Sequence, residues 1–117
     1  MFRNLITVAI LSLWHPGVWA HAFLERAEPA PGSVSTVVPT EVRLAFDSAL
    51  EHAFCAVRVE DPSGGVVATG EIQHVSGDPN RLVVSIPGLG SGTYQVRWSV
   101  VSRDGHQTEG DYPFTIE

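Results

Sequence analysis

The chain has 117 residues, with 7 basic and 13 acidic side chains and a formal net charge of −6. All of the basic residues are arginine. This balance argues against a nucleic-acid partner, because non-specific binding to phosphates needs clustered cations. It is compatible with cation binding, although mild acidity is also an ordinary property of exported domains.

Residues 1–20 have the pattern of a secretory signal peptide. Arg3 gives a positive start, an apolar run follows from Leu5 to Trp14, and Val18-Trp19-Ala20 is a small-residue cleavage motif. The apolar run is shorter than the ~20 residues that a membrane span needs, so we expect cleavage after Ala20; an uncleaved anchor is the alternative. Cleavage would leave 97 residues, 21–117, which suffice for one soluble domain.

The remaining region alternates between short extended segments and turn-forming residues. Apolar residues at every second position, as in Val42, Leu44 and Phe46, are typical of half-buried strands. Clusters of proline, glycine, aspartate and serine between these segments predict turns, and no window has a sustained helical period. We expect about seven strands, at residues 22–28, 42–46, 53–60, 66–73, 81–86, 92–101 and 112–116. This spacing is typical of a single all-β sandwich or barrel.

Two side chains are expected to contribute to the core of this domain. Trp98 lies on the apolar side of the segment 92–101, together with Tyr94, Val96 and Val100. Cys55 is the only cysteine in the sequence, which excludes an internal disulfide, and we expect it to be a small buried hydrophobic residue. Packing and sheet hydrogen bonds must therefore hold the fold together.

The stretch Ser102-Arg103-Asp104-Gly105-His106 follows the clearest strand pattern in the sequence. It sets a carboxylate and an imidazole two positions apart, where side chains of extended backbone project from the same side. After cleavage, His21 would be the first residue and would offer its α-amine and its ring Nδ1. With Asp104 and His106 it gives three nitrogens and one oxygen, a mixed set that favours one Cu(II) ion. A methionine-rich Cu(I) site is excluded, because Met1 is the only methionine and leaves with the signal peptide.

Simpler interpretations of these residues stay open. Asp104-Gly105 is a common turn pair, and a histidine can follow a cleavage motif by chance. The coordination sphere could be completed by Asp47, Glu51 or water. The remaining histidines of the domain, His52 and His74, are expected to be solvated surface residues.

The sequence resembles the CopC family of periplasmic copper-resistance proteins, which also includes PcoC and YobA-type domains. The resemblance covers essentially all of residues 21–117 and lies in the His21-Ala22 start and in several later blocks. These blocks are Pro29-Ala30-Pro31-Gly32, Val42-Arg43-Leu44-Ala45-Phe46, Gly92-Thr93-Tyr94, Val96-Arg97-Trp98, Val100-Val101-Ser102, Asp104-Gly105-His106 and Gly110. It implies a Greek-key β-sandwich or barrel of cupredoxin-like or immunoglobulin-like topology. It also implies a Cu(II) site made by His21, Asp104 and His106.

From these observations we expect a periplasmic Cu(II)-binding protein rather than an enzyme. Such a protein would sequester copper, or deliver it to an inner-membrane CopD-like transporter or another periplasmic copper protein. One alternative is a metal-free β-sandwich that serves as an interaction domain. Another is a histidine-brace copper oxygenase, which is disfavoured because Trp98 is the only tryptophan outside residues 1–20. A flat polysaccharide-binding face would need more aromatic side chains than this.

Overall fold

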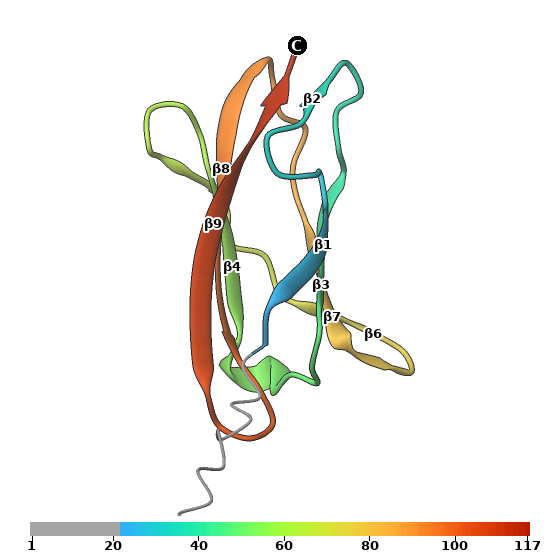
Figure 1. Ribbon diagram of the computed structural model, residues 1–117. Helices are drawn as coiled ribbons and strands as arrows, with labels where there is room; N and C mark the ends of the chain where they lie inside the picture. The colour runs from blue at the N-terminus through green and yellow to red at the C-terminus, as the bar shows by residue number, and fades with distance from the viewer. Residues whose placement is uncertain (1–21) are drawn as a thin grey trace, which may run out of the picture.

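The alternating apolar residues of the sequence form the facing surfaces of two β-sheets in the computed structural model, which describes residues 22–117 (Figure 1). One sheet has the strand order β1-β3-β7-β6 and the other β2-β9-β8-β4-β5. The strands of the first sheet are β1 (Leu24–Glu28), β3 (Glu41–Phe46), β7 (Asp78–Ser85) and β6 (Gln73–Val75). Those of the second are β2 (Val34–Ser35), β9 (Gln107–Ile116), β8 (Gly92–Val101), β4 (Ala56–Glu60) and β5 (Val66–Ala68). The predicted signal peptide lies outside the described residues.

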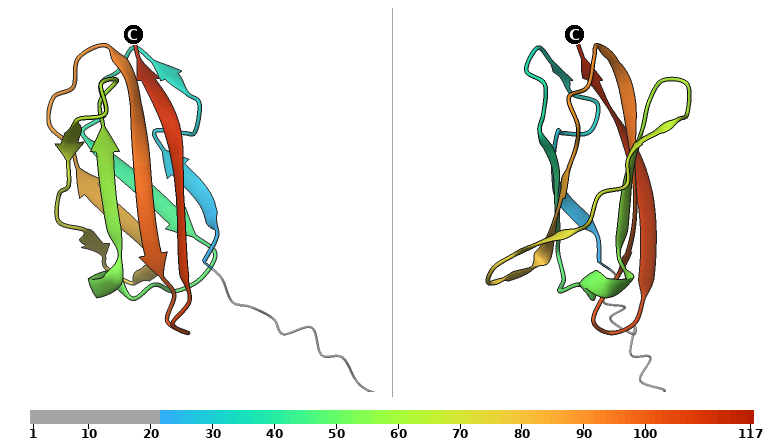
Figure 2. Two further views of the ribbon diagram at one scale, coloured as in Figure 1. Left: turned by 90° about the vertical axis from the view of Figure 1, so that its left-hand side faces the viewer. Right: turned by 180° about the vertical axis from the view of Figure 1, so that it is seen from behind.

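The chain passes repeatedly from one sheet to the other, so the expected all-β Greek-key sandwich is confirmed (Figure 2). All paired strands are antiparallel except β2 and β9, which pair in parallel over two residues. The β8–β9 hairpin is the longest pairing and runs in register from Gly92 opposite Ile116 to Val101 opposite Gln107. The loop that closes this hairpin, after Val101 and before Gln107, is the turn that contains Asp104 and His106. Among residues 22–117, no helix is long and apolar enough to cross a membrane.

The core lies between the sheets and contains the residues that the alternation predicts. Val42, Leu44 and Phe46 of β3 are at most 2% exposed. The Phe46 ring meets Trp98 of the opposite sheet edge-on, with ring centroids 5.1 Å apart. Trp98 itself is partly buried and lies over Gly110, where an added Cβ would come within 2.5 Å of the indole. This close approach fixes the hairpin that carries the turn.

Two expected strands differ from the observed ones. The segment that was expected to begin a strand at residue 53 is a short 3-10 turn, η1 (His52–Phe54), and β4 starts only at Ala56. The expected strand over residues 66–73 is divided between β5 and β6, which belong to different sheets. Between them Gly70 passes close to β7, where an added Cβ would lie 3.2 Å from the Ser85 carbonyl oxygen. The chain crosses the edge of the sandwich at this point instead of continuing one strand.

Candidate metal centre

The turn between β8 and β9 is closed by its own backbone. The Ser102 N–H donates to the His106 carbonyl oxygen at 2.9 Å, and the Gly105 N–H donates to the Ser102 carbonyl oxygen at 2.9 Å. Gly105 has a φ of 89°, in the left-handed region that glycine adopts without steric cost. Arg103 N–H donates to the Ala49 carbonyl oxygen at 3.0 Å and ties the turn to the neighbouring segment. The two predicted ligands therefore project from a fixed backbone.

The Asp104 carboxylate lies between a hydroxyl and an imidazole. Ser102, which is only 2% exposed, donates its Oγ–H to Oδ1 of Asp104. The other oxygen, Oδ2, lies 3.0 Å from Nδ1 of His106. The Ser102 hydroxyl and then His106 hold the pKa of Asp104 at about 2. The carboxylate is thus ionised at neutral pH and in contact with an imidazole.

Both side chains are accessible to solvent. The Asp104 side chain is 35% exposed and that of His106 is 38% exposed. A carboxylate oxygen and an imidazole nitrogen at this separation are donors that suit divalent copper, nickel and zinc. Among residues 22–117, no group of three or more His, Cys, Asp or Glu side chains is arranged to hold a metal ion. In the described part of the chain, the candidate centre is therefore a pair of donors, Asp104 and His106.

The start of the described chain lies at the same end of the sandwich as this turn. Figures 1 and 2 show the start of the described chain at the end of the sandwich where the loop joins β8 to β9, while the C-terminus lies at the opposite end. The contact is specific: Thr108 Oγ1 donates to the Ala22 carbonyl oxygen at 2.8 Å, across 86 positions of sequence. Ala22 is fully buried. His21, the third predicted ligand, lies outside the described residues.

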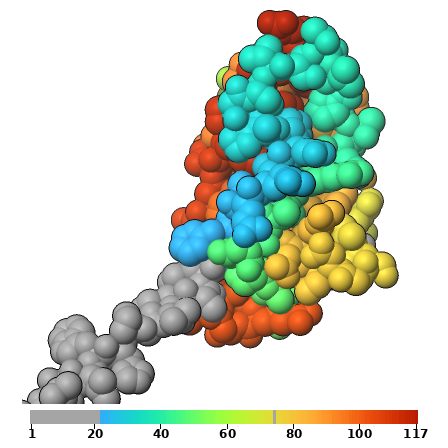
Figure 3. All heavy atoms as spheres, turned by 45° about the vertical axis from the view of Figure 1, so that its right-hand side comes forward, coloured from blue at the N-terminus to red at the C-terminus, as the bar shows by residue number. Residues whose placement is uncertain are grey.

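Asp47 holds the next residue of this segment in place. Its backbone N–H donates to the Phe23 carbonyl oxygen at 3.0 Å, and its Oδ1 accepts the Phe23 N–H at 2.8 Å. Figure 3 shows the first described residues running along the surface to meet the segment that follows β3. The other candidate for an additional oxygen ligand, Glu51, lies in the segment that pairs with the end of β8, where its N–H donates to the Val101 carbonyl oxygen at 2.8 Å. Asp47 therefore has a definite role in binding the start of the chain.

The other histidines and the cysteine lie elsewhere in the structure. His52 is partly buried, and its Nε2 lies 2.9 Å from the Arg81 carbonyl oxygen, so it is less solvated than expected. Cys55 is half-buried rather than fully buried; its Sγ donates to the Glu51 carbonyl oxygen at 3.3 Å, and burial raises the pKa of the thiol. His74 lies in β6.

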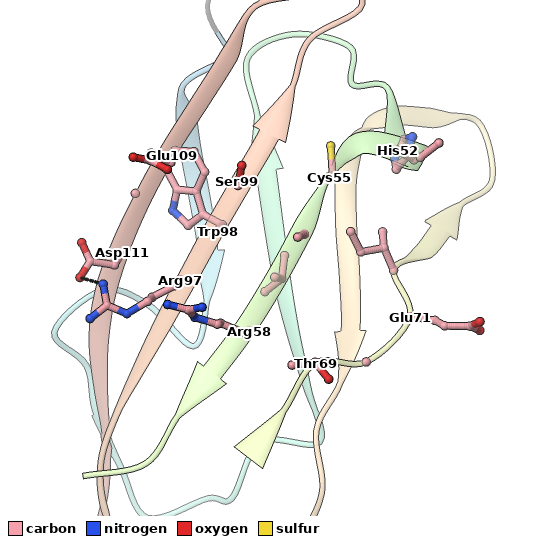
Figure 4. Close-up of a pocket in the computed structure, with 16 residues that line it drawn as sticks. His52, Cys55, Arg58, Thr69, Glu71, Arg97, Trp98, Ser99, Glu109 and Asp111 are labelled. Carbon is pink, nitrogen blue, oxygen red and sulfur yellow. Dashed lines mark ion pairs between the residues drawn. The ribbon is translucent and has the colours of Figure 1, made fainter. Parts of the chain in front are cut away.

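A separate groove lies on the second sheet, beside the crossing between β5 and β6 (Figure 4). It is about 1200 Å³ in volume, and its lining includes Arg58, Arg97, Asp111 and Glu71 but neither Asp104 nor His106. Arg97 pairs with Glu60 at 2.9 Å and with Asp111 at 3.5 Å. The charge of Arg97 is thus compensated within the sheet. Because neither Asp104 nor His106 lines the groove, the candidate metal centre is a separate surface feature of the turn.

Two contacts of the candidate centre were not assigned from the sequence. Ser102 stands two positions before Asp104 and donates to it within the same turn. Thr108 stands two positions after His106, and its partner, Ala22, is brought to it only by the fold. The side chains of alternate residues share one side of an extended chain. This spacing is the only sign in the sequence that Ser102 and Thr108 belong to the same surface as the predicted ligands.

Comparisons with known proteins agree with this architecture. The family model of the CopC domain matches residues 24–117. Protein YobA of Escherichia coli K12 is 34% identical over 116 residues, which cover 98% of this chain and 94% of YobA. The copper transport protein CutJ of Bacillus subtilis is 27% identical over 99 residues, which cover 84% of this chain but only 18% of CutJ.

Solved structures with the same fold include those of CopC and PcoC. CopC from Methylosinus trichosporium OB3b superimposes with a TM-score of 0.79 at 32% identity, over 83% of this chain and 94% of that one. PcoC from Escherichia coli, described as a methionine-rich copper resistance protein, gives a TM-score of 0.75 at 29% identity, over 84% of this chain and 100% of PcoC. This chain, in contrast, has a single methionine, Met1. The match over nearly the whole described region shows that the chain is a member of the CopC family.

Proposed function

We propose that this protein binds one Cu(II) ion in the periplasm through His21, Asp104 and His106. In this proposal residues 1–20 are a signal peptide, and residues 21–117 form the CopC-like domain that is released by cleavage. His21 supplies its α-amine and ring Nδ1, Asp104 a carboxylate oxygen, and His106 a ring nitrogen. Water fills any remaining position.

The observation that carries this proposal is the hydrogen bond from Thr108 to the Ala22 carbonyl oxygen. Consecutive Cα atoms lie about 3.8 Å apart, so the Cα atom of the residue before Ala22 can be no farther than this from the Cα atom of Ala22. Thr108 in turn follows His106 by two positions. The position of Ala22 beside β9 therefore supports the proposal that His21 meets Asp104 and His106 at one end of the sandwich.

The donor set favours copper storage or transfer over catalysis. Three nitrogens and an oxygen in a tetragonal arrangement suit Cu(II), which also has the highest affinity among the divalent first-row metals. An anionic ligand such as Asp104 stabilises Cu(II) over Cu(I) and should slow redox cycling, which disfavours a copper oxygenase. The copper-related descriptions of PcoC and CutJ support a role in copper resistance or transport. The recipient would be a CopD-like membrane transporter or another periplasmic copper protein.

Copper titration of two matched proteins tests this proposal. One protein begins at His21, and the other carries a single additional Met before it, which removes the α-amine as a terminal donor. The first should bind one Cu(II) with an electron paramagnetic resonance spectrum that indicates several nitrogen ligands. The extended protein should bind more than about tenfold more weakly, because loss of an outer partner alone already costs ~10–100-fold. Equal affinity and identical spectra would remove the N-terminal chelate from the proposal, and absence of Cu(II) binding would favour a metal-free interaction domain.

The dependence of affinity on pH provides a second measure of the same site. An amine and imidazoles bind a metal only in their neutral forms, so metal binding releases protons. Free α-amines and imidazoles ordinarily titrate near pH ~7.8 and ~6.5. The Cu(II) affinity of the protein that begins at His21 should therefore fall steeply as the pH is lowered from ~8 to ~5. A constant affinity over this range would contradict coordination by these groups.

A further inference from the structure

The first two described residues are fixed by side chains from two different sheets. Thr108 of β9 donates to the Ala22 carbonyl oxygen at 2.8 Å. Asp47, directly after β3, accepts the Phe23 N–H at Oδ1, at 2.8 Å, and its own N–H donates to the Phe23 carbonyl oxygen at 3.0 Å. Ala22 is fully buried and forms part of the core cluster. Three hydrogen bonds and a buried methyl group thus define the path of the chain at its first described residue.

This arrangement is more than a strand pairing. β1 begins only at Leu24 and is paired with β3, whereas Ala22 is bound to β9 of the other sheet. The start of the chain therefore bridges the open end of the sandwich, beside the β8–β9 turn. Because an extended residue spans at most ~3.6 Å, the Cα atoms of His106 and Thr108 are no more than ~7 Å apart. The hydrogen bond to Ala22 is formed next to the donor pair of the candidate centre.

We infer that Thr108 and Asp47 are positioning residues that hold the N-terminal donors of His21 against Asp104 and His106. This inference rests on the proposed function. A chelate from a loose chain end must be ordered when the metal binds, whereas an end that is already fixed next to the other donors acts at a high effective concentration. Thr108 and Asp47 do not bind the metal in this arrangement. They set the affinity by fixing the residue that follows the chelate.

The same contacts could serve only to stabilise the fold, and the two roles differ in one measurable respect. A positioning residue matters only when the donors that it positions are able to bind. Its removal should therefore weaken Cu(II) binding more in the protein that begins at His21 than in the protein extended by Met, which keeps only the ring of His21 as a donor at this end of the chain. A purely structural contact should have the same effect on affinity in both proteins. This difference defines a double-mutant cycle.

The variants follow from the hydrogen bond. Thr108→Val keeps the shape of the side chain and removes its donor, and Thr108→Ser restores the donor. Thr93→Val is the matched control, because the Thr93 hydroxyl pairs with the Thr115 hydroxyl at 2.9 Å, on the same hairpin but towards its other end. Asp47→Ala removes the acceptor for Phe23 and provides a second variant if Thr108→Val does not fold. Each is made in both proteins, and Cu(II) affinity is measured by competition with a chelator of known affinity.

In the protein that begins at His21, Thr108→Val and Asp47→Ala should each weaken Cu(II) binding by about 10-fold, the lower range for loss of a supporting partner. Thr108→Ser should restore affinity, and Thr93→Val should have no effect. In the extended protein each variant should have a smaller effect, because only the His21 ring remains to be positioned. An equal loss in both proteins would overturn the inference, as would no loss in either. Failure of the proposed function is distinguished from these results because the unsubstituted proteins would then bind Cu(II) equally or not at all.

Discussion

Two turns of this sandwich use the same chemistry and hold their aspartates in different ways. The β4–β5 turn contains Asp61 and Gly64, and the β8–β9 turn contains Asp104 and Gly105, with the two glycines at φ values of 86° and 89°. In each turn a serine two positions away donates its hydroxyl to the carboxylate. The turns lie at opposite ends of the molecule (Figure 1). From the sequence alone, both are ordinary turns that contain an aspartate, a serine and a glycine.

The difference lies in what else the carboxylate binds. Oδ1 of Asp61 accepts the Ser63 hydroxyl at 2.6 Å and the N–H groups of Ser63 and Gly65 at 2.9 and 2.8 Å. This carboxylate is satisfied by its own turn. Asp104 has only a long contact with backbone, 3.4 Å from the His106 N–H, and its second oxygen faces the His106 imidazole at 3.0 Å. One aspartate holds a turn together, and the other forms a pair with the second side chain that we propose as a metal ligand.

Replacement of His106 by alanine should give the largest contrast between the two turns. It removes an imidazole donor, so the Cu(II) affinity of the protein that begins at His21 should fall by more than the ~10–100-fold that loss of an outer partner costs. Asp61→Ala breaks the hydrogen bonds of the other turn and should leave copper affinity unchanged while it lowers thermal stability. Competition titration and thermal unfolding measure both effects. A loss of less than about tenfold for His106→Ala would show that the imidazole is not a ligand.

The regular strands could be predicted from the sequence because burial alternates along them. Apolar residues at alternate positions are at most 6% exposed in three strands: Val42, Leu44 and Phe46 in β3, Tyr94, Val96 and Val100 in β8, and Tyr112, Phe114 and Ile116 in β9. The alternation was misleading around residues 53–55, where the same pattern continues through the 3-10 turn η1. It was also misleading at Gly70, where the chain changes sheets without a change in composition. A crossing of this kind is determined by contacts between distant segments, which local pattern does not encode.

In the candidate site, likewise, only the local arrangement could be predicted from the sequence. Asp104 and His106 stand two positions apart, so their proximity follows from local geometry. The contacts that fix the start of the chain at the same end of the sandwich join residues that are distant in sequence, so the sequence did not reveal them. Thr108 reaches Ala22 across 86 positions, and Asp47 reaches Phe23 across 24. Asp47 was considered as an additional ligand because it carries a carboxylate, whereas the fold uses that carboxylate to bind backbone.

Removal of the serine hydroxyl from each turn should give a smaller difference in Cu(II) affinity than the substitutions of His106 and Asp61. Ser102→Ala removes the donor that fixes Asp104, and Cu(II) affinity should fall by about 10-fold, as for other partners that orient a ligand. Ser63→Ala removes the equivalent hydroxyl from the Asp61 turn and should leave affinity unchanged. Ser102→Thr, which keeps a hydroxyl, is the rescue variant. If Ser63→Ala weakened copper binding as much as Ser102→Ala, the effect would be a general loss of stability and not a property of the metal centre.

The smallest difference should appear in the acid titration of the metal-free protein. The Ser63 hydroxyl, followed by the Gly65 N–H, lowers the pKa of Asp61, and the Ser102 hydroxyl, followed by His106, holds the pKa of Asp104 at about 2. A carboxyl whose pKa is lower in the folded chain stabilises the fold above its unfolded value of ~3.9 and loses this contribution as the pH falls through its folded value. Carbon-13 spectra of the carboxyl groups should show that Ser63→Ala raises only the pKa of Asp61 and Ser102→Ala only that of Asp104. If the pKa of Asp104 were unchanged in Ser102→Ala, the His106 imidazole alone would account for its low value. The two turns would then differ in their chemistry and not only in their geometry.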